Sequence, residues 1–222
     1  MQRAQTLESL ARRLLELRLP RPLRVAIDGI DASGKTWLAD ELAQVLRAAN
    51  QPVIRASIDG FHHPRALRYR RGKESPEGYY ADSFDYPGLR CALLEPLGPG
   101  GSRRYRTAIF DYRQDCPLDQ PEQVADPNAI LILDGIFLLR PELAENWEVR
   151  IFVQVSFETS LERALRRDAP ALGGEEQVRQ RYQLRYFPAQ RLYLQRCDPL
   201  HQADAVLFND EPQTPRLEWR KD

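Results

Sequence analysis

A glycine-rich loop offers the clearest chemistry in this sequence. Residues 29–36 match the pattern G-x-x-x-x-G-K-T. Glycine at both positions lets the backbone turn tightly and aim N–H groups at phosphate oxygens. Lys35 would reach the β and γ phosphates, and the Thr36 hydroxyl suits Mg²⁺. We therefore expect the whole loop to bind ATP or GTP with Mg²⁺, through Gly29, Ile30, Asp31, Ala32, Ser33, Gly34, Lys35 and Thr36.

Two aspartates end predicted strands, and each is followed by glycine. Asp134 comes directly after the apolar run 129–133, and Asp59 comes after the strand predicted over 52–58. A plain Asp-Gly turn is the alternative reading for both. Beside a phosphate-binding loop, however, a carboxylate in the position of Asp134 can hold Mg²⁺ together with Thr36. Asp59 could accept the proton of an attacking hydroxyl, so we predict it as the catalytic base.

Arginine clusters follow on two predicted helices near the C-terminal third. Arginine in a lid can neutralise charge on a transferring phosphoryl group. A solvated helix face explains any single arginine equally well, but we expect Arg163 and Arg167 to contact the nucleotide. His62 lies three residues after Asp59 and could line the site. No carboxylate or cysteine recurs near it at the spacing of metal ligands, so we do not assign it to a metal.

Strands and helices alternate along the chain in the way that a parallel sheet requires. The segment 61–86 shows no clear period and is predicted as substrate-facing loops, and 104–112 as a pair of short strands. Strands are predicted at 23–27, 52–58, 129–133, 149–155 and a last one at 205–208. Helices are predicted at 1–19, 37–49, 89–97, 157–167 and 175–197, the last interrupted near Pro188.

These elements predict an α/β fold, a doubly wound parallel sheet with helices on both faces and a small helical lid. Right-handed crossovers would place ligands beyond the carboxyl ends of the strands. We expect one domain over residues 1–222. Its parts would be an N-terminal helix (1–19), an acceptor-binding insertion (about 60–112) and a lid region (about 163–185).

Composition limits the partners. The 222 residues carry no net charge, which argues against a general binder of nucleic acid or of an acidic membrane surface. No apolar run is long enough to span a membrane, and the N-terminus has no apolar signal core. The three cysteines are far apart, as is typical of free thiols in a reducing compartment. We expect a cytoplasmic protein that binds a nucleoside triphosphate and a small-molecule acceptor, with a homo-oligomer left open.

The order of several segments resembles the uridine kinase and phosphoribulokinase group of P-loop kinases. Residues 28–36 resemble that group's loop, and residues 59–62 its Asp-x-Phe segment, whose Asp is the catalytic base. Residues 83–87 resemble the Phe-Asp-His-Pro segment, and residues 110–112 the Tyr-Asp-Phe segment beside the nucleoside. The family's C-terminal third is matched from Glu176 to Val206, so the resemblance covers about residues 23 to 209.

This resemblance implies an ATP-dependent kinase that phosphorylates a hydroxyl of a small molecule, such as the 5′-hydroxyl of uridine. It assigns the ribose hydroxyls to Asp85. Other acceptor contacts that it implies are His62, Phe110, Tyr112 and Arg181.

The sequence also departs from the uridine kinases. Residues 113–116 contain no base-reading histidine, and residues 171–174 replace the Arg-Gly-Arg run of the lid. A kinase of another hydroxyl compound, such as a sugar, a sugar phosphate or a pantothenate-like molecule, is therefore an alternative. A nucleotide-binding regulator without catalysis is a third hypothesis. Asp59 and Asp85 together argue against it, because a switch needs neither a hydroxyl base nor a polyol clamp.

Overall fold

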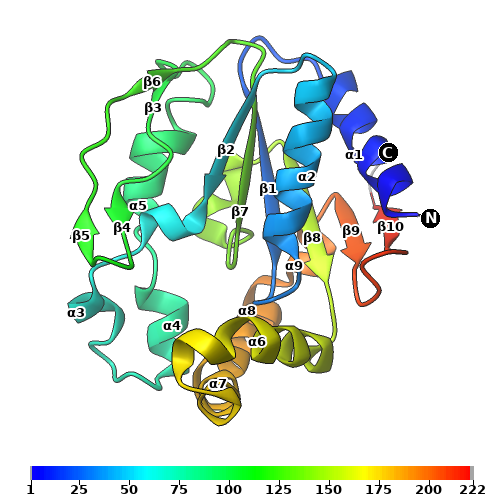
Figure 1. Cartoon of the computed structure of the whole chain (residues 1–222). Coiled ribbons are helices and arrows are strands. Elements are labelled where there is room, and N and C mark those ends of the chain that lie inside the picture. The colour runs from blue at the N-terminus through cyan, green and yellow to red at the C-terminus, as the bar shows by residue number, and fades with distance from the viewer. Residues whose placement is uncertain (1, 221–222) are drawn as a thin grey trace.

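A six-stranded sheet forms the centre of the molecule, which a computed structural model describes for residues 2–220 (Figure 1). Its order is β10-β9-β8-β1-β7-β2, and every neighbouring pair is parallel except β10 with β9. The strands are β1 (Leu23–Gly29), β2 (Val53–Ser57), β7 (Ile130–Gly135), β8 (Val149–Gln154), β9 (Ala205–Phe208) and β10 (Arg216–Trp219). The prediction of a doubly wound, mostly parallel sheet is confirmed.

Burial on both faces explains why the central strands read as continuous apolar runs. Every residue of β1 and β7 is buried. In the register of the sheet, Asp134 of β7 pairs with Ile27 of β1 and with Ser57 of β2. The carboxyl ends of these three strands therefore meet at one edge.

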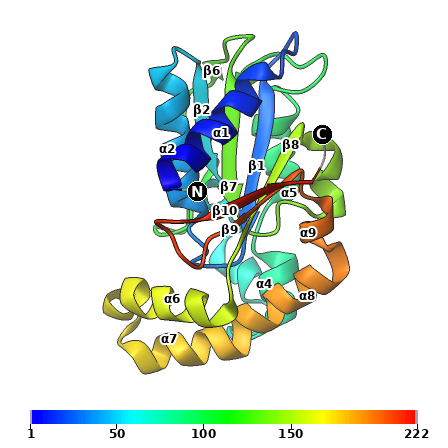
Figure 2. The same ribbon diagram turned by 90° about the vertical axis from the view of Figure 1, so that its right-hand side faces the viewer.

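Two helices cover one face of the sheet, as Figure 2 shows. They are α1 (Arg3–Glu16) and α2 (Lys35–Ala48). Leu10 and Leu14 of α1 pack with Leu42 and Leu46 of α2 in one buried cluster that also holds Ile132 of β7. The helix predicted at 1–19 is thus present but shorter, and Met1 lies outside the described residues.

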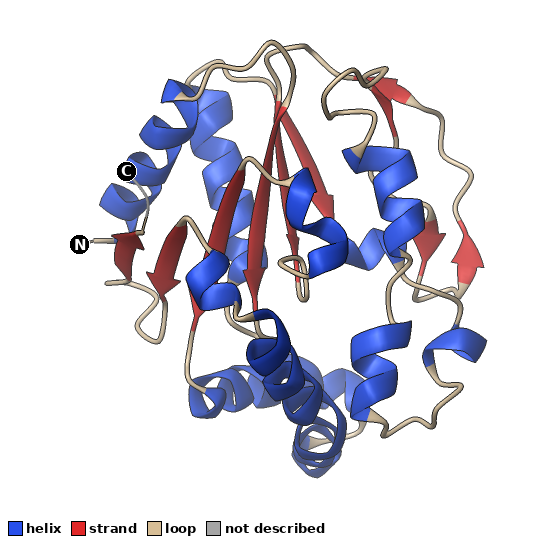
Figure 3. Cartoon of the chain, turned by 180° about the vertical axis from the view of Figure 1, so that it is seen from behind, coloured by secondary structure: helices blue, strands red, loops and turns tan. Residues whose placement is uncertain are grey.

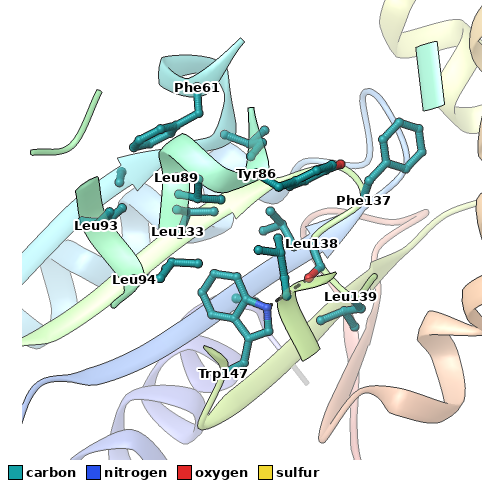
Figure 4. Packing of buried hydrophobic residues seen from close by; sticks show 14 of the residues in the cluster. Phe61, Tyr86, Leu89, Leu93, Leu94, Leu133, Phe137, Leu138, Leu139 and Trp147 are labelled. Atoms are coloured by element: carbon teal, nitrogen blue, oxygen red, sulfur yellow. Dashed lines mark hydrogen bonds between the residues drawn. The ribbon is translucent and has the colours of Figure 1, made fainter. Parts of the chain in front are cut away.

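The opposite face of the sheet is covered by short helices, seen from behind in Figure 3, and its side chains form a separate buried cluster. Short helices contribute to it, among them α5 (Tyr86–Leu89), a π-turn (Arg90–Leu94) and α9 (Pro199–Gln202). Figure 4 shows Trp147 packed beside Leu138, whose carbonyl accepts a 3.0 Å hydrogen bond from the indole nitrogen. Trp147 follows a 3₁₀ turn (Pro141–Asn146). Its indole is therefore buried with its polar group satisfied.

The segment between β2 and β7 holds short elements only. A 3₁₀ turn (Ile58–Phe61) leads to α3 (Arg65–Arg68) and α4 (Pro76–Asp82). The two short strands predicted within 104–112 are present as β3 (Arg104–Tyr105) and β4 (Phe110–Asp111). β3 pairs with β6 (Gln123–Val124), and β4 pairs with β5 (Cys116–Pro117).

A helical hairpin lies below the carboxyl edge of the sheet (Figures 1 and 2). It consists of α6 (Phe157–Leu172) and α7 (Glu175–Arg181), and α6 ends at Gly173, whose φ of 87° is left-handed. Beyond α7 the chain widens into a π-turn (Tyr182–Tyr186) and continues as α8 (Phe187–Cys197). The predicted interruption near Pro188 is this π-turn, which is consistent with proline's missing N–H.

No helix among residues 2–220 is both long and apolar enough to cross a membrane. The prediction that 205–208 is the last strand is wrong, since β10 returns beside β9 as an antiparallel edge.

Candidate active site

The phosphate-binding loop takes the conformation that its glycines allow. A Cβ on Gly29 would lie 2.6 Å from the carbonyl oxygen of Val153, and a Cβ on Gly34 would lie 2.7 Å from Nδ2 of Asn209. Gly34 also has a φ of 92° and forms the N-cap of α2. Lys35 then opens this helix, so its N-terminal N–H groups and the loop amides are available to an anion.

Two side chains of the loop are held by protein oxygens or donors. The Lys35 ammonium donates to the carbonyl of Ile30 at 3.1 Å. Oδ2 of Asp31 accepts from the Tyr79 hydroxyl at 2.9 Å and from Nε2 of Gln190 at 2.8 Å. These bonds fix the position of the Asp31 carboxylate, whose charge also raises the pKa of Asp59.

Thr36 and Asp134 lie together, as the metal prediction requires. The Thr36 hydroxyl donates to Oδ2 of Asp134 at 2.5 Å. Arg55 of β2 places Nη2 2.8 Å from Oδ1 of Asp134 without hydrogen-bond alignment, so that contact is an ion pair. Hydroxyl and carboxylate oxygens are the ligands that Mg²⁺ prefers, usually alongside phosphate oxygens. The residues present therefore fit Mg²⁺ bound with a nucleotide.

Asp59 lies in the 3₁₀ turn after β2, at the same edge of the sheet. Loss of surrounding water, and to a lesser extent the charge of Asp134, raise the pKa of its carboxyl group to about 6 against the opposing charge of Lys35. The side chain is still 56% exposed. The carboxyl group is therefore close enough to Lys35 and Asp134 to be affected by their charges, and it is still accessible to an incoming hydroxyl.

His62 and Tyr112 form a stacked pair beside Asp59. The two rings lie 4.8 Å apart at 28°, and Phe84 contacts the other side of His62 at 4.5 Å. Burial lowers the pKa of His62 to about 4, so the ring is neutral. Its Nδ1 lies 3.0 Å from the Asp59 carbonyl, which can only accept, so Nδ1 carries the proton and Nε2 is an acceptor.

Two other predicted acceptor residues have local structural tasks. Oδ1 of Asp85 accepts from the backbone N–H of Gly88 at 2.8 Å and so caps α5. Its own N–H donates to the Phe61 carbonyl at 2.8 Å, which ties it to the turn of Asp59. Phe110 is only 6% exposed, so its ring packs inside the protein and is not open to an acceptor.

The predicted lid arginines are bound to protein groups. Arg163 donates to the carbonyls of Ser33, Asn209 and Asp210 at 3.3, 2.7 and 3.0 Å. Arg167 makes two hydrogen bonds to Asp168, at 2.6 and 2.9 Å, which raise the pKa of its guanidinium. The charge of Arg167 also lowers the pKa of Asp59. Arg181 is exposed at the end of α7.

Asp28 is a buried carboxylate that the sequence interpretation passed over. It accepts from the N–H groups of Gly29, Leu138 and Leu139 at 2.6, 3.1 and 3.1 Å, and from the Tyr193 hydroxyl. Burial raises its pKa to about 6. An aspartate inside an apolar strand, directly before the loop, was the available signal.

Arg185 was predicted only as one of the arginines of the lid region, and it instead joins the turn before α8 to the segment after β2. From the π-turn its guanidinium donates to the carbonyls of Arg68, Gly72, Lys73 and Ser75 at 2.9 to 3.4 Å. It also lies over the rings of Tyr69 and Tyr79, at 4.9 and 5.4 Å. These contacts fix the loop over residues 68–75.

Comparisons with known proteins agree with this geometry. Uridine kinase from Chloroflexus aurantiacus is 27% identical over 192 residues, which cover 84% of this chain and 86% of that protein. Uridine-cytidine kinase B from Dictyostelium discoideum is 27% identical over 152 residues, or 68% of this chain, and the match spans only 60% of the relative's length.

A solved structure of a possible uridine kinase from Bacillus stearothermophilus has the same fold. The TM-score is 0.73 at 24% identity, with 93% of this chain and 98% of that one covered. The family model described as "Phosphoribulokinase / Uridine kinase family" matches residues 25–211, which include the phosphate-binding loop, Asp59 and Asp134. The chain therefore belongs to the phosphoribulokinase / uridine kinase family, and its fold is the P-loop NTPase fold.

Proposed function

We propose that the protein transfers the γ-phosphoryl group of ATP to a hydroxyl of a nucleoside such as uridine, giving a 5′-monophosphate. One observation carries the proposal. Lys35, the Thr36–Asp134 pair and Asp59 lie at the carboxyl ends of three adjacent strands. That arrangement brings together a cation that binds phosphate, a pair of metal ligands and a base for the acceptor hydroxyl.

The residues divide the reaction as follows. Loop amides and the Lys35 ammonium bind and orient the phosphates of the nucleotide. Asp59, with its raised pKa, accepts the proton that the acceptor hydroxyl loses. Thr36 and Asp134 would hold Mg²⁺, which supplies positive charge between the phosphate oxygens.

The acceptor side supports a nucleoside through its aromatic residues. His62 and Tyr112 present stacked rings next to Asp59, and the neutral His62 offers an Nε2 acceptor. The lack of histidine in residues 113–116 favours a second candidate, a kinase of another small hydroxyl compound. Both candidates use the same phosphate and base residues.

A product-detected screen separates these candidates. ATP and Mg²⁺ are supplied with uridine, cytidine, adenosine, simple sugars, D-glycerate or pantothenate, and phosphorylated product is measured. Lys35→Ala serves as the matched inactive control, because it removes the ammonium group that binds the phosphates. Product with uridine or cytidine supports the nucleoside proposal, and product with a sugar or acid alone moves the function to the second candidate. If no acceptor gave product, the third hypothesis, a nucleotide-binding regulator without catalysis, would be favoured.

Asp85 provides a sharper test once a ribonucleoside is accepted. If its free carboxylate oxygen holds ribose hydroxyls, Asp85→Asn should raise the acceptor KM by about 10-fold or more while the ATP KM stays within about 2-fold. Removing the 2′-hydroxyl of the acceptor should then weaken the wild type more than the variant. Equal loss in both enzymes would show that Asp85 only caps α5.

A further inference from the structure

Trp37 exposes an aromatic side chain directly after the phosphate-binding loop. It lies in the first turn of α2, one residue beyond Thr36, and 75% of the residue's surface is exposed. The other two tryptophans differ, since Trp147 is 4% exposed and Trp219 is partly buried. Burying an indole is strongly favourable, so an exposed one beside a ligand site is a candidate contact for that ligand.

The helix that carries Trp37 begins directly after its N-cap glycine. Gly34 is three residues before Trp37, and its left-handed φ of 92° sets it outside the helix itself. Asn209 packs against Gly34, with its Nδ2 2.7 Å from the position of a Cβ there. The turn after β9 therefore borders the N-terminal end of α2.

The face of α2 that carries Trp37 also carries Glu41, four residues further on, which is ion-paired with Arg3 of α1. Arg3 in turn donates to the carbonyl of Pro212 at 3.3 Å. Residues 209–212, which run beside the start of α2 (Figure 2), are thus linked to this helix directly at Gly34 and through Arg3 at Glu41.

Asn209 adds a second feature that points to a ligand. The residue is 3% exposed, its Nδ2 donates to the Ser33 carbonyl at 2.8 Å, and Arg163 holds its backbone carbonyl. Its Oδ1, however, is buried with no hydrogen-bond partner among the described residues. An unpaired buried acceptor is unfavourable, so a ligand donor next to it would be stabilised.

We propose that Trp37 is the stacking platform for the base of the bound nucleotide, with the side chain of Asn209 at its margin. The proposal rests on the nucleotide binding proposed above and adds the residue that contacts the base. Phosphates bound by the loop amides and the first turn of α2 place the nucleoside end beyond Thr36, which is where Trp37 stands. Every nucleobase has an aromatic face, so such a platform tolerates different bases.

Calorimetric titration tests this with two ligands, ADP and inorganic tripolyphosphate. Trp37→Ala should weaken ADP by about 5- to 150-fold and leave tripolyphosphate unchanged, because only ADP has a base to stack. Trp37→Phe should keep most of the ADP affinity. Val124→Ala, which removes another exposed apolar side chain on β6, should bind both ligands like the wild type. ADP should also quench the tryptophan emission of the wild type but not that of Trp37→Phe.

Three other outcomes have distinct meanings. Equal weakening of ADP and tripolyphosphate in Trp37→Ala would show that the ring supports the loop, and would overturn the platform. Unchanged ADP affinity in Trp37→Ala would overturn it as well. If that variant also lost self-association in sedimentation, the ring would be assigned to a contact with a second copy of the chain. Failure of the wild type to bind ADP would overturn the proposed function together with this inference.

Discussion

At the scale of single residues, two carboxylates at the edge of the sheet have different surroundings and therefore different tasks. Asp134 is 1% exposed and is paired with Thr36 and Arg55. Asp59 is open to solvent and has its pKa raised to about 6. Environments that separate two acidic groups in this way are typical of a charged metal contact beside a proton acceptor.

Replacing Asp59 with Asn should lower kcat by about 10²- to 10⁴-fold, because the amide cannot accept the proton of the acceptor hydroxyl. Phosphoryl transfer depends mainly on positioning, so the lower end of that range is expected. Steady-state kinetics with the accepted substrate measure the effect, and ADP titration should show unchanged nucleotide affinity. A kcat within 3-fold of the wild type would remove Asp59 from the base role.

The raised pKa of Asp59 also predicts a pH profile. The base is active only when ionised, so kcat/KM should fall as the pH drops through about 6, by about 10-fold per pH unit below that value. An ordinary aspartate would keep its activity to about pH 4. Asp59→Asn should lack this limb of the profile. A wild-type profile that stays flat from pH 7 to pH 5 would contradict the assignment.

At the scale of elements, sequence patterns located those that are buried on both faces and failed at the edges. The run 129–133 was recognised because a strand covered on both sides is apolar at every position, and the run 149–155 because five of its seven residues are apolar. β10 was missed, since its residues Arg216–Trp219 alternate polar and apolar at an exposed edge. The two-residue strands β3 and β4 pair with residues 18–20 and 5–7 positions further along the chain, and no local pattern specifies such pairings.

The 3₁₀ turn that carries Asp59 depends on a close packing contact at Gly60. A Cβ there would lie 2.7 Å from Cβ of Ala108 and 3.0 Å from its Cα, so the turn or the loop that carries Ala108 would have to move. Gly60→Ala should therefore destabilise the protein by about 1–3 kcal/mol in urea unfolding and reduce turnover through displacement of Asp59. Gly78→Ala is the matched control, since its nearest neighbour is 3.3 Å away and α4 favours alanine. Equal stability of the two variants would show that the contact at Gly60 is unimportant.

At the scale of the whole molecule, Asp28 joins three parts of the chain that form the site. Its carboxylate binds the amide that begins the phosphate-binding loop, the amides of Leu138 and Leu139 after β7, and the Tyr193 hydroxyl of α8. Phe137, just before those amides, has a φ of 64°, which is unfavourable for a bulky residue. The network therefore holds the loop after Asp134 in a conformation that it would not adopt alone.

Asp28 should also make stability depend on pH. Its folded pKa of about 6 lies above the unfolded value of 3.8, so the folded state binds the proton more tightly. This contribution favours folding below about pH 4 and is lost as the pH rises through 6, a change of about 3 kcal/mol. Urea unfolding between pH 4 and pH 7 measures it. The free-energy difference between wild type and Asp28→Asn should shift across this window, and a constant difference would contradict the assignment.

The site was predictable where chemistry is carried by adjacent residues and not where it depends on tertiary contacts. The loop 29–36, Asp59 and Asp134 follow strands that sequence could locate, so their approach followed from the sheet order. Arg55 was missed, because only the pairing of β2 with β7 brings it to Asp134. The partners of Asp31 were missed for the same reason, since Gln190 is 159 residues away in the chain.

If the segment over about 60–112 binds the acceptor, as the sequence predicts, the contacts of Arg185 have a consequence for the thermodynamics of that binding. If the loop over residues 68–75 became ordered only when the ligand bound, each backbone residue fixed would cost about 1–2 kcal/mol of binding free energy. Here the carbonyls of Arg68, Gly72, Lys73 and Ser75 are already held by one guanidinium, so that entropy is lost during folding instead. Acceptor association should accordingly need no slow rearrangement of this loop, and its heat-capacity change should reflect only the surface that the small molecule itself buries.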